Sequence, residues 1–394
     1  MSHPTIGILG AGQLGRMLAL AGYPLGLRFR FLDPAPGAPA GHLAEHMQAG
    51  YEDAATLERF SAGLDAVTYE FENVPLAAAR FLAERVPVYP PPAALEAAQD
   101  RLVEKTFFQK LGVATPLFAP VDTQADLDAA IAQIGLPAVL KTRRLGYDGK
   151  GQIILREPAD AATAWAALGD APLIIEGFVP FARELSILAA RDHNGETAFF
   201  PLVENHHRDG ILRLSLAPAP GTTRALQAAA ERIAARALAA LEYVGVLAIE
   251  LFQVPRARDW GLGAGRAISQ SPVSSPQPLL VNEMAPRVHN SGHWTIEGAE
   301  TSQFEQHLRA VLGLPLGTTT ARGFSAMVNL IGALPDPAAV LAIPGAHLHL
   351  YGKQPRAGRK VGHVTIRADA RGELEERLAR VQSLIELPQF GNIP

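Results

Sequence analysis

Two carboxylates stand in otherwise apolar, strand-like segments of the 394-residue chain. Glu250 is the single acid of LAIELF, and Glu283 is the single acid of LLVNEMA, where Asn282 precedes it. An ionised carboxylate in an apolar setting is costly unless it is paired or binds a cation. On neighbouring strands, the two acids would form a hard-cation site that holds Mg2+ against polyphosphate oxygens. Alternatively, they face solvent or pair with arginines, and side-chain alternation leaves both possibilities open.

The segment KTRRLGYDGKGQ, residues 141–152, has the composition of a phosphate-binding loop. Its glycines are Gly146, Gly149 and Gly151. Because glycine has no side chain, backbone N–H groups can converge there on phosphate oxygens, and Lys141 could add a compact positive charge. A solvated hairpin turn is the alternative. A nucleotide alone does not explain Tyr147 and Asp148, because phosphate repels a carboxylate.

A dense group of hydrogen-bonding side chains follows Glu283 in APRVHNSGHW. The group comprises Arg287, His289, Asn290, Ser291 and His293. This density is typical of a substrate-binding loop, although a network of capping hydrogen bonds could use the same residues. A metal site built from the histidines is less favoured, because no carboxylate or third histidine lies at close spacing.

Four cations lie close together near the C-terminus, in YGKQPRAGRKVGH. They are Lys353, Arg356, Arg359 and Lys360. In a mildly acidic protein this cluster indicates an anion site or, alternatively, a solvated charged turn.

The N-terminal sequence GAGQLG, Gly10 to Gly15, follows a strand-like run and opens a helical one, with Asp33 about twenty residues on. This is the spacing of a dinucleotide-binding fingerprint, in which the acid holds a ribose hydroxyl. The alternatives are a different ligand, or small residues that serve only the close packing of a first strand, turn and helix.

The elements that must position these residues change character along the chain. The first hundred residues predict a parallel, doubly wound sheet. Its strands are expected at Thr5–Leu9, Arg28–Asp33, Ala66–Val74 and Val86–Pro90, with a helix over Gln13–Ala21. The run AALEAAQDRLVEKTFFQKLG predicts one helix that stops at Gly112.

Beyond Pro116 the pattern predicts a hairpin, LPAVLKTRR and QIILRE, which is a plausible mobile flap. An antiparallel sheet is expected beyond Ala182, interrupted by one long helix near Thr223–Glu242. Pro255–Pro278 is rich in Gly, Pro and Ser and is expected to be an exposed, disordered loop.

Composition narrows the class of protein. Hydrophobic residues make up 48% and charged residues 19% of the chain, as in ordinary globular domains. The net charge of -4 disfavours a nucleic-acid or anionic-membrane binder. There are no cysteines, which excludes disulfides and thiolate chemistry. Neither a signal peptide nor an apolar run of roughly 20 residues is present, so a cytoplasmic protein is expected.

In their fixed order, the motifs resemble those of the ATP-grasp superfamily and, within it, the N5-carboxyaminoimidazole ribonucleotide synthetase family. The resemblance covers almost the whole chain. It is carried by GILGAGQLGRML, TYEFENVP, the helix with Asp100 and Arg101, KTRRLGYDGKGQ, EGFVPFARELS, ENHHRDGIL, LAIELF, VNEMAPRVHNSGHWT and YGKQPRAGRKVGH. Formate-dependent ribonucleotide formylases and biotin carboxylases share the grasp but not the strings NEMAPRVHNSGHWT and GYDGKG. Pro255–Pro278 departs from the family, whose connection is usually short.

The resemblance implies an ATP-grasp fold of mixed α/β and α+β class. A Rossmann-like preATP-grasp domain would span residues 1–100, and a linker helix with a hairpin-bearing lid would span 101–181. The larger antiparallel lobe would span 182–394 and end in a small β-rich subdomain, 325–394.

The resemblance also implies the site residues. ATP would be surrounded by Arg101, Lys141, Gly146, Tyr147, Asp148, Gly149, Lys150, Gly151, Gln152, Glu176, Gly177, Phe178, Val179, Glu184, His207, Asn282 and Glu283. Mg2+, with Mn2+ as a possible substitute, would bind Glu250 and Glu283. The ribonucleotide would contact Lys150, Asn290, Ser291, Arg359 and Lys360. Catalytic roles are implied for Tyr147, Asp148, Arg287, His289 and Lys353.

The implied reaction belongs to de novo purine synthesis. ATP phosphorylates bicarbonate to carboxyphosphate, which delivers CO2 to the exocyclic amine of 5-aminoimidazole ribonucleotide in a site closed from water. The loop's composition then has an explanation: its glycines would cover ATP phosphates, while Tyr147 and Asp148 would face the ribonucleotide. Asp148 would orient the amine and help remove its proton. A homodimer without nucleic-acid or membrane partners is also implied.

Three other functions compete with this one. Another ATP-grasp ligase could act on a different ribonucleotide or carboxylate. An NAD-dependent oxidoreductase would explain Gly10 to Asp33 but neither the paired acids nor the glycine loop. A non-catalytic nucleotide-binding regulator would be favoured if the two acids proved unpaired.

Overall fold

The fold is that of a computed structural model, which describes residues 3–146, 149–255 and 279–385. Tyr147, Asp148 and all but the first residue of the Pro255–Pro278 stretch lie outside these ranges. Within them, no helix is long and apolar enough to cross a membrane.

The N-terminal part is a parallel sheet of strand order β3-β2-β1-β4, as the sequence predicts. Its elements are β1 (Thr5–Leu9), α1 (Gln13–Gly22), η1 (Tyr23–Leu25), β2 (Arg28–Leu32), β3 (Glu45–Met47), α2 (Ala54–Ser61), β4 (Ala66–Tyr69) and α3 (Leu76–Ala83). Apolar side chains on both faces of the strands enter separate cores, one shared with α1 and with α10 (Gln303–Val311) and the other with α2 and α3. The expected strand at Val86–Pro90 is wrong: it contributes only an isolated bridge from Val88 to Val67.

The single helix predicted before Gly112 is also wrong, because the chain forms two helices, α4 (Pro92–Gln99) and α5 (Arg101–Lys110). They are separated by Asp100, whose backbone is extended (φ -127°, ψ 117°) and whose carboxylate accepts hydrogen bonds from the N–H groups of Leu102 and Val103. Aspartate is among the strongest helix N-caps, so a helix can begin directly after it.

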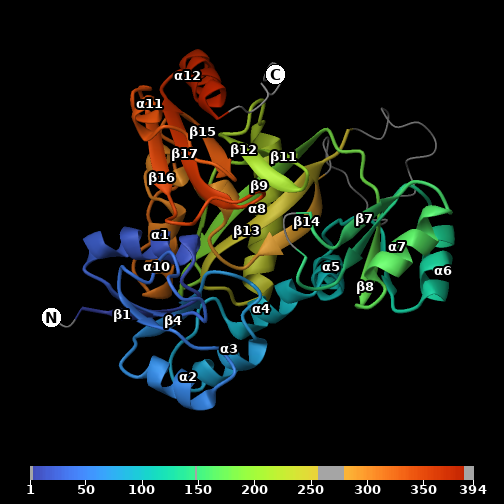
Figure 1. Cartoon of the computed structure of the whole chain (residues 1–394), viewed down its shortest axis with the longest axis horizontal. Coiled ribbons are helices and arrows are strands. Elements are labelled where there is room, and N and C mark those ends of the chain that lie inside the picture. The colour runs from blue at the N-terminus through green and yellow to red at the C-terminus, as the bar shows by residue number, and fades with distance from the viewer. Residues whose placement is uncertain (1–2, 147–148, 256–278, 386–394) are drawn as a thin grey trace.

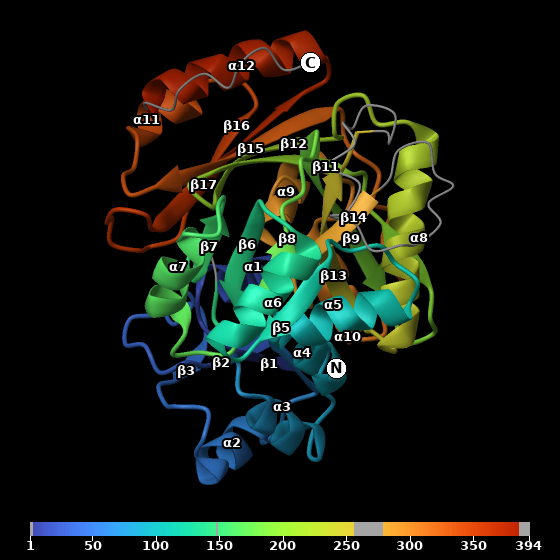
Figure 2. The same cartoon turned by 90° about the vertical axis from the view of Figure 1, so that its right-hand side faces the viewer.

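A small sheet of order β5-β8-β6-β7 stands apart from the N-terminal sheet on the right of Figure 1, and it faces the viewer in Figure 2. It is built from β5 (Phe118–Val121), α6 (Gln124–Ile134), β6 (Ala138–Thr142), β7 (Gln152–Leu155), α7 (Asp160–Leu168) and β8 (Leu173–Gly177). Strands β6 and β7 pair antiparallel, with Lys141 opposite Gln152. The predicted hairpin is therefore confirmed.

A nine-stranded antiparallel sheet forms the rest of the molecule, in the order β14-β13-β9-β11-β12-β15-β17-β16 with β10 beside β9 (Figure 1). Its strands are β9 (Arg183–Arg191), β10 (Thr197–Phe199), β11 (Val203–Arg208), β12 (Ile211–Ala217), β13 (Gly245–Gln253), β14 (Leu279–Ala285), β15 (Phe324–Ile331), β16 (Ala346–Leu350) and β17 (Lys360–Ala368). The helices are α8 (Arg224–Ala240), η4 (Asn290–Gly292), α9 (Thr295–Gly298), α10 (Gln303–Val311), α11 (Pro337–Leu341) and α12 (Arg371–Leu384).

The long helix α8 packs its apolar face on β9 and β13, where Leu226, Ala230 and Leu238 share a core with Leu185 and Leu247. The C-terminal strands β15 to β17 continue the same sheet through the pairing of β12 with β15. The expected β-rich terminal segment is thus joined to the large lobe by backbone hydrogen bonds.

Candidate active site

A cleft of about 640 Å³ opens where the three sheets meet. Nineteen predicted site residues line it: Arg101, Lys141, Gly146, Gly149, Lys150, Gln152, Glu176, Gly177, Phe178, Val179, Glu184, His207, Glu250, Asn282, Glu283, Arg287, His289, Asn290 and Lys360. Gly151, Ser291, Lys353 and Arg359 are described but are not part of its lining. The structure therefore brings most of the predicted site together from segments far apart in the sequence.

Glu250 on β13 and Glu283 on β14 are direct cross-strand partners. The register then shifts, because Leu251 pairs with Val281, which leaves Asn282 as the extra residue of a β-bulge. In a regular strand neighbouring side chains point to opposite faces, but here Asn282 and Glu283 both line the cleft. The bulge thus places three oxygen-bearing side chains on one surface.

The two acids are in different electrostatic states. Arg101 Nη1 lies 2.8 Å from Glu283 Oε2. Burial opposes ionisation of Glu283, but the guanidinium of Arg101 holds its pKa well below the usual range. Burial, and then the neighbouring charge of Glu283, raises the pKa of Glu250 to about 7. Ionisation of Glu250 is therefore unfavourable until a cation offsets its charge.

The donor set of this pair fits a divalent cation. Carboxylate and amide oxygens suit Mg2+, which is usually held by one or two carboxylates together with substrate phosphates. The amide oxygen of Asn282 is buried and accepts no hydrogen bond from the described residues. The described residues contain no cluster of three or more His, Cys, Asp or Glu suited to a metal.

Glu176 on β8 is the centre of a buried cationic cluster. Lys141 Nζ lies 2.9 Å from its Oε2, and Lys105 Nζ lies 3.4 Å from the same atom. Burial would raise the pKa of Glu176, but Lys105, Lys141 and Arg101 together lower it to about 2. Of these cations Lys141 and Arg101 line the cleft, where positive charge suits polyphosphate.

The glycine loop has backbone conformations that require glycine. Gly149 and Gly151 have φ of +75° and +71°, and a Cβ on Gly151 would lie 2.5 Å from the hydroxyl of Thr142. At the base of the hairpin, Asp100 accepts a bidentate pair of bonds from Arg143, at 3.0 and 2.9 Å. The entrance of the loop is therefore fixed to the start of α5.

Another part of the cleft lining combines a polar pair and two aromatic rings. Glu184 Oε2 lies 2.8 Å from His207 Nδ1, and although burial opposes it, this contact raises the pKa of His207. Phe181 and Phe252, which both line the cleft, stack in parallel with ring centroids 4.8 Å apart. Such a surface suits a planar base next to a ribose. Sequence reasoning missed Phe181 and Phe252, although Phe252 stands in the motif LAIELF.

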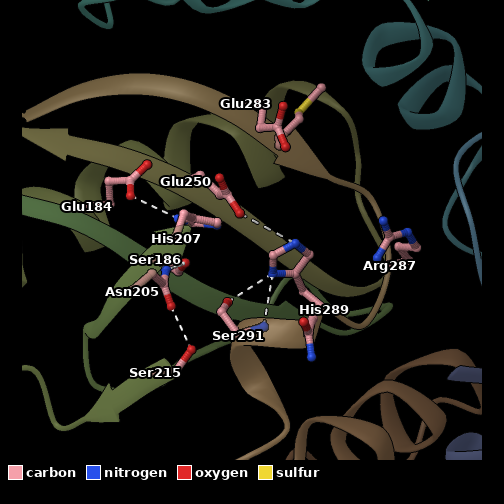
Figure 3. A network of polar contacts seen from close by, with 12 residues as sticks. Glu184, Ser186, Asn205, His207, Ser215, Glu250, Glu283, Arg287, His289 and Ser291 are labelled. Atoms are coloured by element: carbon pink, nitrogen blue, oxygen red, sulfur yellow. Dashed lines mark hydrogen bonds and ion pairs between the residues drawn. The ribbon is translucent and has the colours of Figure 1, made fainter. Parts of the chain in front are cut away.

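His289 faces Glu250, as Figure 3 shows, with its Nε2 3.6 Å from Glu250 Oε1. Its Nδ1 accepts the backbone N–H of Ser291 and lies 2.9 Å from the hydroxyl of Ser291. Burial, and secondarily the charge of Arg287, lowers the pKa of His289 to about 3, so the ring is neutral. With Nδ1 as the acceptor, the proton lies on Nε2 and points toward Glu250.

Other residues of the same loop are held by partners that the motifs did not reveal. Arg287 donates to Glu72 of the TYEFENVP segment. Asn290 and Asn329 exchange two amide hydrogen bonds, at 3.1 and 2.7 Å. Ser291 has no exposed surface, and its described side-chain contact is with His289.

The glycine turn after β1 is occupied by the protein itself. The carboxylate of Glu70 accepts the N–H groups of Gly12 and, at 2.7 Å, Gly15. Asp33 accepts the N–H of Ala11 at 2.8 Å. A buried carboxylate therefore lies where the pyrophosphate of a dinucleotide would bind. Lys353 donates a hydrogen bond to Gln13, the first residue of helix α1, which follows this turn.

Comparison with known proteins decides the family. Three family models match in succession: the ribonucleotide synthetase preATP-grasp domain over residues 3–99, the ATP-grasp domain over 106–304, and the phosphoribosylaminoimidazole carboxylase C-terminal domain over 325–377. The N5-carboxyaminoimidazole ribonucleotide synthase of Pseudomonas aeruginosa is 56% identical over 97% of this chain and 99% of its own. The chain belongs to the N5-carboxyaminoimidazole ribonucleotide synthase family.

Solved structures of this synthase family share the fold. The N5-carboxyaminoimidazole ribonucleotide synthetase of Thermus thermophilus is 60% identical, with a TM-score of 0.89 over 98% of this chain and 99% of that one. The Aspergillus clavatus synthase, solved with ADP and 5-aminoimidazole ribonucleotide, is 31% identical with a TM-score of 0.84, and each chain is covered to 98%. The chain is accordingly an ATP-grasp ligase, and the fold and family predicted from the motifs are confirmed.

Proposed function

We propose that the cleft carboxylates 5-aminoimidazole ribonucleotide to its N5-carboxyamino derivative, with ATP and bicarbonate as co-substrates and ADP and phosphate as further products. The observation that carries the proposal is the single cleft in which the pair Glu250 and Glu283 lies beside both Lys141 and the Arg287–His289 loop. The relative from Aspergillus clavatus, solved with ADP and the ribonucleotide, supports both ligands.

Phosphoryl transfer to bicarbonate depends on positioning and on neutralising charge. Glu250, Glu283 and Asn282 would hold Mg2+, or Mn2+ in its place, which would neutralise charge on the ATP phosphates. Lys141 and Arg101, which both lower the pKa of Glu176, supply fixed positive charge in the cleft. The glycine loop binds the phosphates through backbone N–H groups, and the adenosine occupies the wall with Phe252, Glu184 and His207.

Carboxyphosphate then delivers CO2 to the exocyclic amine of the ribonucleotide: a C–N bond forms, phosphate leaves, and the amine loses a proton. Arg287 attracts the anionic groups, and neutral His289 donates through Nε2–H to the developing carboxylate. Tyr147 and Asp148 would act in the same step, as the family resemblance implies. Asp148 orients the amine and accepts its proton.

Residues of the glycine loop, of the loop after Glu283 and of the C-terminal cation cluster hold the ribonucleotide. Lys150 and Asn290 contact it, and Arg359 and Lys360 bind its phosphate. Lys353 orders the ribonucleotide from its position beside Gln13. Ser291 acts through His289, because its hydroxyl is buried against that ring.

Four properties of the whole chain complete the proposal. The domains are residues 1–100, 101–181 and 182–394, with a C-terminal subdomain at 325–394. The enzyme acts as a homodimer in the cytoplasm, on small molecules alone.

Exchange of the acyl donor and of the acceptor tests the substrate assignment against other ATP-grasp ligases. ADP release is measured with bicarbonate or formate as donor, and with 5-aminoimidazole ribonucleotide or glycinamide ribonucleotide as acceptor. The proposal expects turnover with bicarbonate and 5-aminoimidazole ribonucleotide, at least ~100-fold above the other combinations. Equal or faster turnover with formate would contradict the proposal and indicate a formylase instead.

A further inference from the structure

The backbone around Glu283 is held by two ionisable side chains of helix α5. Lys105 Nζ donates to the carbonyl of Asn282 at 2.5 Å, and Glu104 Oε1 accepts the N–H of Met284 at 2.6 Å. These two groups belong to the peptide bonds directly before and after Glu283. The position of the Glu283 backbone is therefore fixed from both sides.

Both side chains are buried to an extent unusual for their types. Lys105 has 0% and Glu104 has 2% of its surface exposed. Buried charges are costly unless each has a partner. Here Lys105 also lies 3.4 Å from Glu176, so the two helix residues connect β14 with the cluster around Glu176.

The β-bulge explains why the backbone needs this support. Asn282 has no cross-strand partner in the β13–β14 ladder, so Lys105 provides a hydrogen bond to its carbonyl group that the ladder does not provide. Without the bulge, Asn282 and Glu283 would point to opposite faces of the sheet. Both oxygen donors reach the cleft only while the bulge is kept.

We infer that Lys105 and Glu104 are positioning residues for the divalent-cation site, because they lock the bulge that presents Asn282 and Glu283 together. The inference rests on the proposed assignment of Glu250 and Glu283 to Mg2+. Partners that orient metal ligands typically change metal affinity by roughly 10- to 100-fold when they are removed.

Mn2+ binding to the full-length chain with ADP, followed by the electron paramagnetic resonance of free Mn2+, tests the inference without turnover. Lys105→Met removes the charge at nearly constant volume, and Glu104→Leu removes the acceptor. Each should weaken Mn2+ binding by roughly 10- to 100-fold. Glu104→Gln keeps an acceptor oxygen and should restore most of the affinity. Lys110→Met, an exposed site on the same helix, should match the unmodified chain.

The variant Glu283→Gln distinguishes failure of the cation-site assignment from failure of the positioning role. If Glu283→Gln binds Mn2+ as well as the unmodified chain, the cation site is overturned and the inference with it. If Glu283→Gln loses affinity while Lys105→Met and Glu104→Leu do not, the inference alone is overturned. Thermal melting checks that each variant is folded. If Lys105→Met does not fold, the difference in Mn2+ affinity between Glu104→Leu and Glu104→Gln tests the inference.

Discussion

Glu250 and Glu283 are direct cross-strand partners, yet Arg101 neutralises Glu283 while Glu250 faces the ring of His289 at 3.6 Å. Two acids in one apolar sheet are thus held in unequal states. Arg101 stabilises the ionised form of Glu283, whereas ionisation of Glu250 is costly until a cation binds. This inequality leads to two of the predictions below.

Loss of either acid should abolish most of the activity. Glu250→Gln and Glu283→Gln each remove one carboxylate of the pair that would hold Mg2+ against the ATP phosphates, so kcat/KM for ATP should fall by at least ~100-fold. Steady-state ADP release with bicarbonate and 5-aminoimidazole ribonucleotide measures this. The exposed Glu300→Gln, whose side chain pairs with Arg322, is the control. Variants of Glu250 and Glu283 that keep activity within threefold would contradict the cation assignment.

Cation affinity should depend on pH near neutrality. Because the pKa of Glu250 is raised to about 7, its carboxyl group is protonated below that pH and competes poorly for Mg2+. We expect affinity to rise as pH increases from about 6 to 8. Isothermal titration with Mg2+ and ADP measures it, and Glu250→Gln should give a weaker, nearly flat profile. An unchanged affinity at pH 6 in the unmodified chain would refute the shift.

Stability should fall in mild acid because of buried neutral histidines. His307 Nδ1 accepts the N–H of Val246, its Nε2 lies 2.8 Å from the hydroxyl of Thr68, and burial lowers its pKa to about 4. A histidine whose pKa is lower folded than unfolded binds fewer protons in the folded state. The free energy of unfolding is therefore lost as pH falls below about 6.5, and the loss continues to about 4.

From pH 7 to 5, His307 alone should contribute a loss of about 2 kcal/mol. Urea unfolding at both values measures the total, to which His289, His293 and His363 also contribute, since burial lowers the pKa of each. His307→Gln should be less stable at pH 7 but should lose less on acidification. An identical loss in both proteins would show that His307 is not responsible.

Nicotinamide cofactors should not bind, despite the N-terminal glycine fingerprint. The N–H groups of Gly12 and Gly15 already donate to Glu70, and a carboxylate in that position repels a pyrophosphate. Titration with NADH, followed by its fluorescence, should show no saturation up to about 1 mM. Micromolar binding would restore the oxidoreductase alternative.

Local patterns in the sequence were sufficient for most elements of the fold. Short apolar runs identified β13 and β14, and the glycine turn between two apolar runs identified the β6–β7 hairpin. The strand expected at Ala66–Val74 ends earlier, since β4 covers only Ala66–Tyr69. Two further details failed because a local signal had more than one meaning. Asp100 was included in a helix although its type favours a cap, and Val86–Pro90 has strand composition but forms only one bridge.

The candidate site was predictable where a motif carried its residues, and not where distant partners determine its geometry. The bulge at Asn282 breaks the alternation on which strand prediction depends. The contacts of Lys105 with Asn282 and of Glu104 with Met284 join residues 177 and 180 positions apart, so no local window contains both partners. Glu70 likewise lies 58 positions from Gly12, whose N–H group it accepts.

The most direct test of the proposed function is ADP and phosphate release from Mg-ATP and bicarbonate, with and without 5-aminoimidazole ribonucleotide, while the carboxylated product is monitored. We expect the ribonucleotide to stimulate ADP release strongly, only when bicarbonate is present, with one carboxylated product formed per ADP. ATP turnover that is indifferent to the ribonucleotide, without carboxylated product, would contradict the proposed function and leave a different ligase substrate to be found.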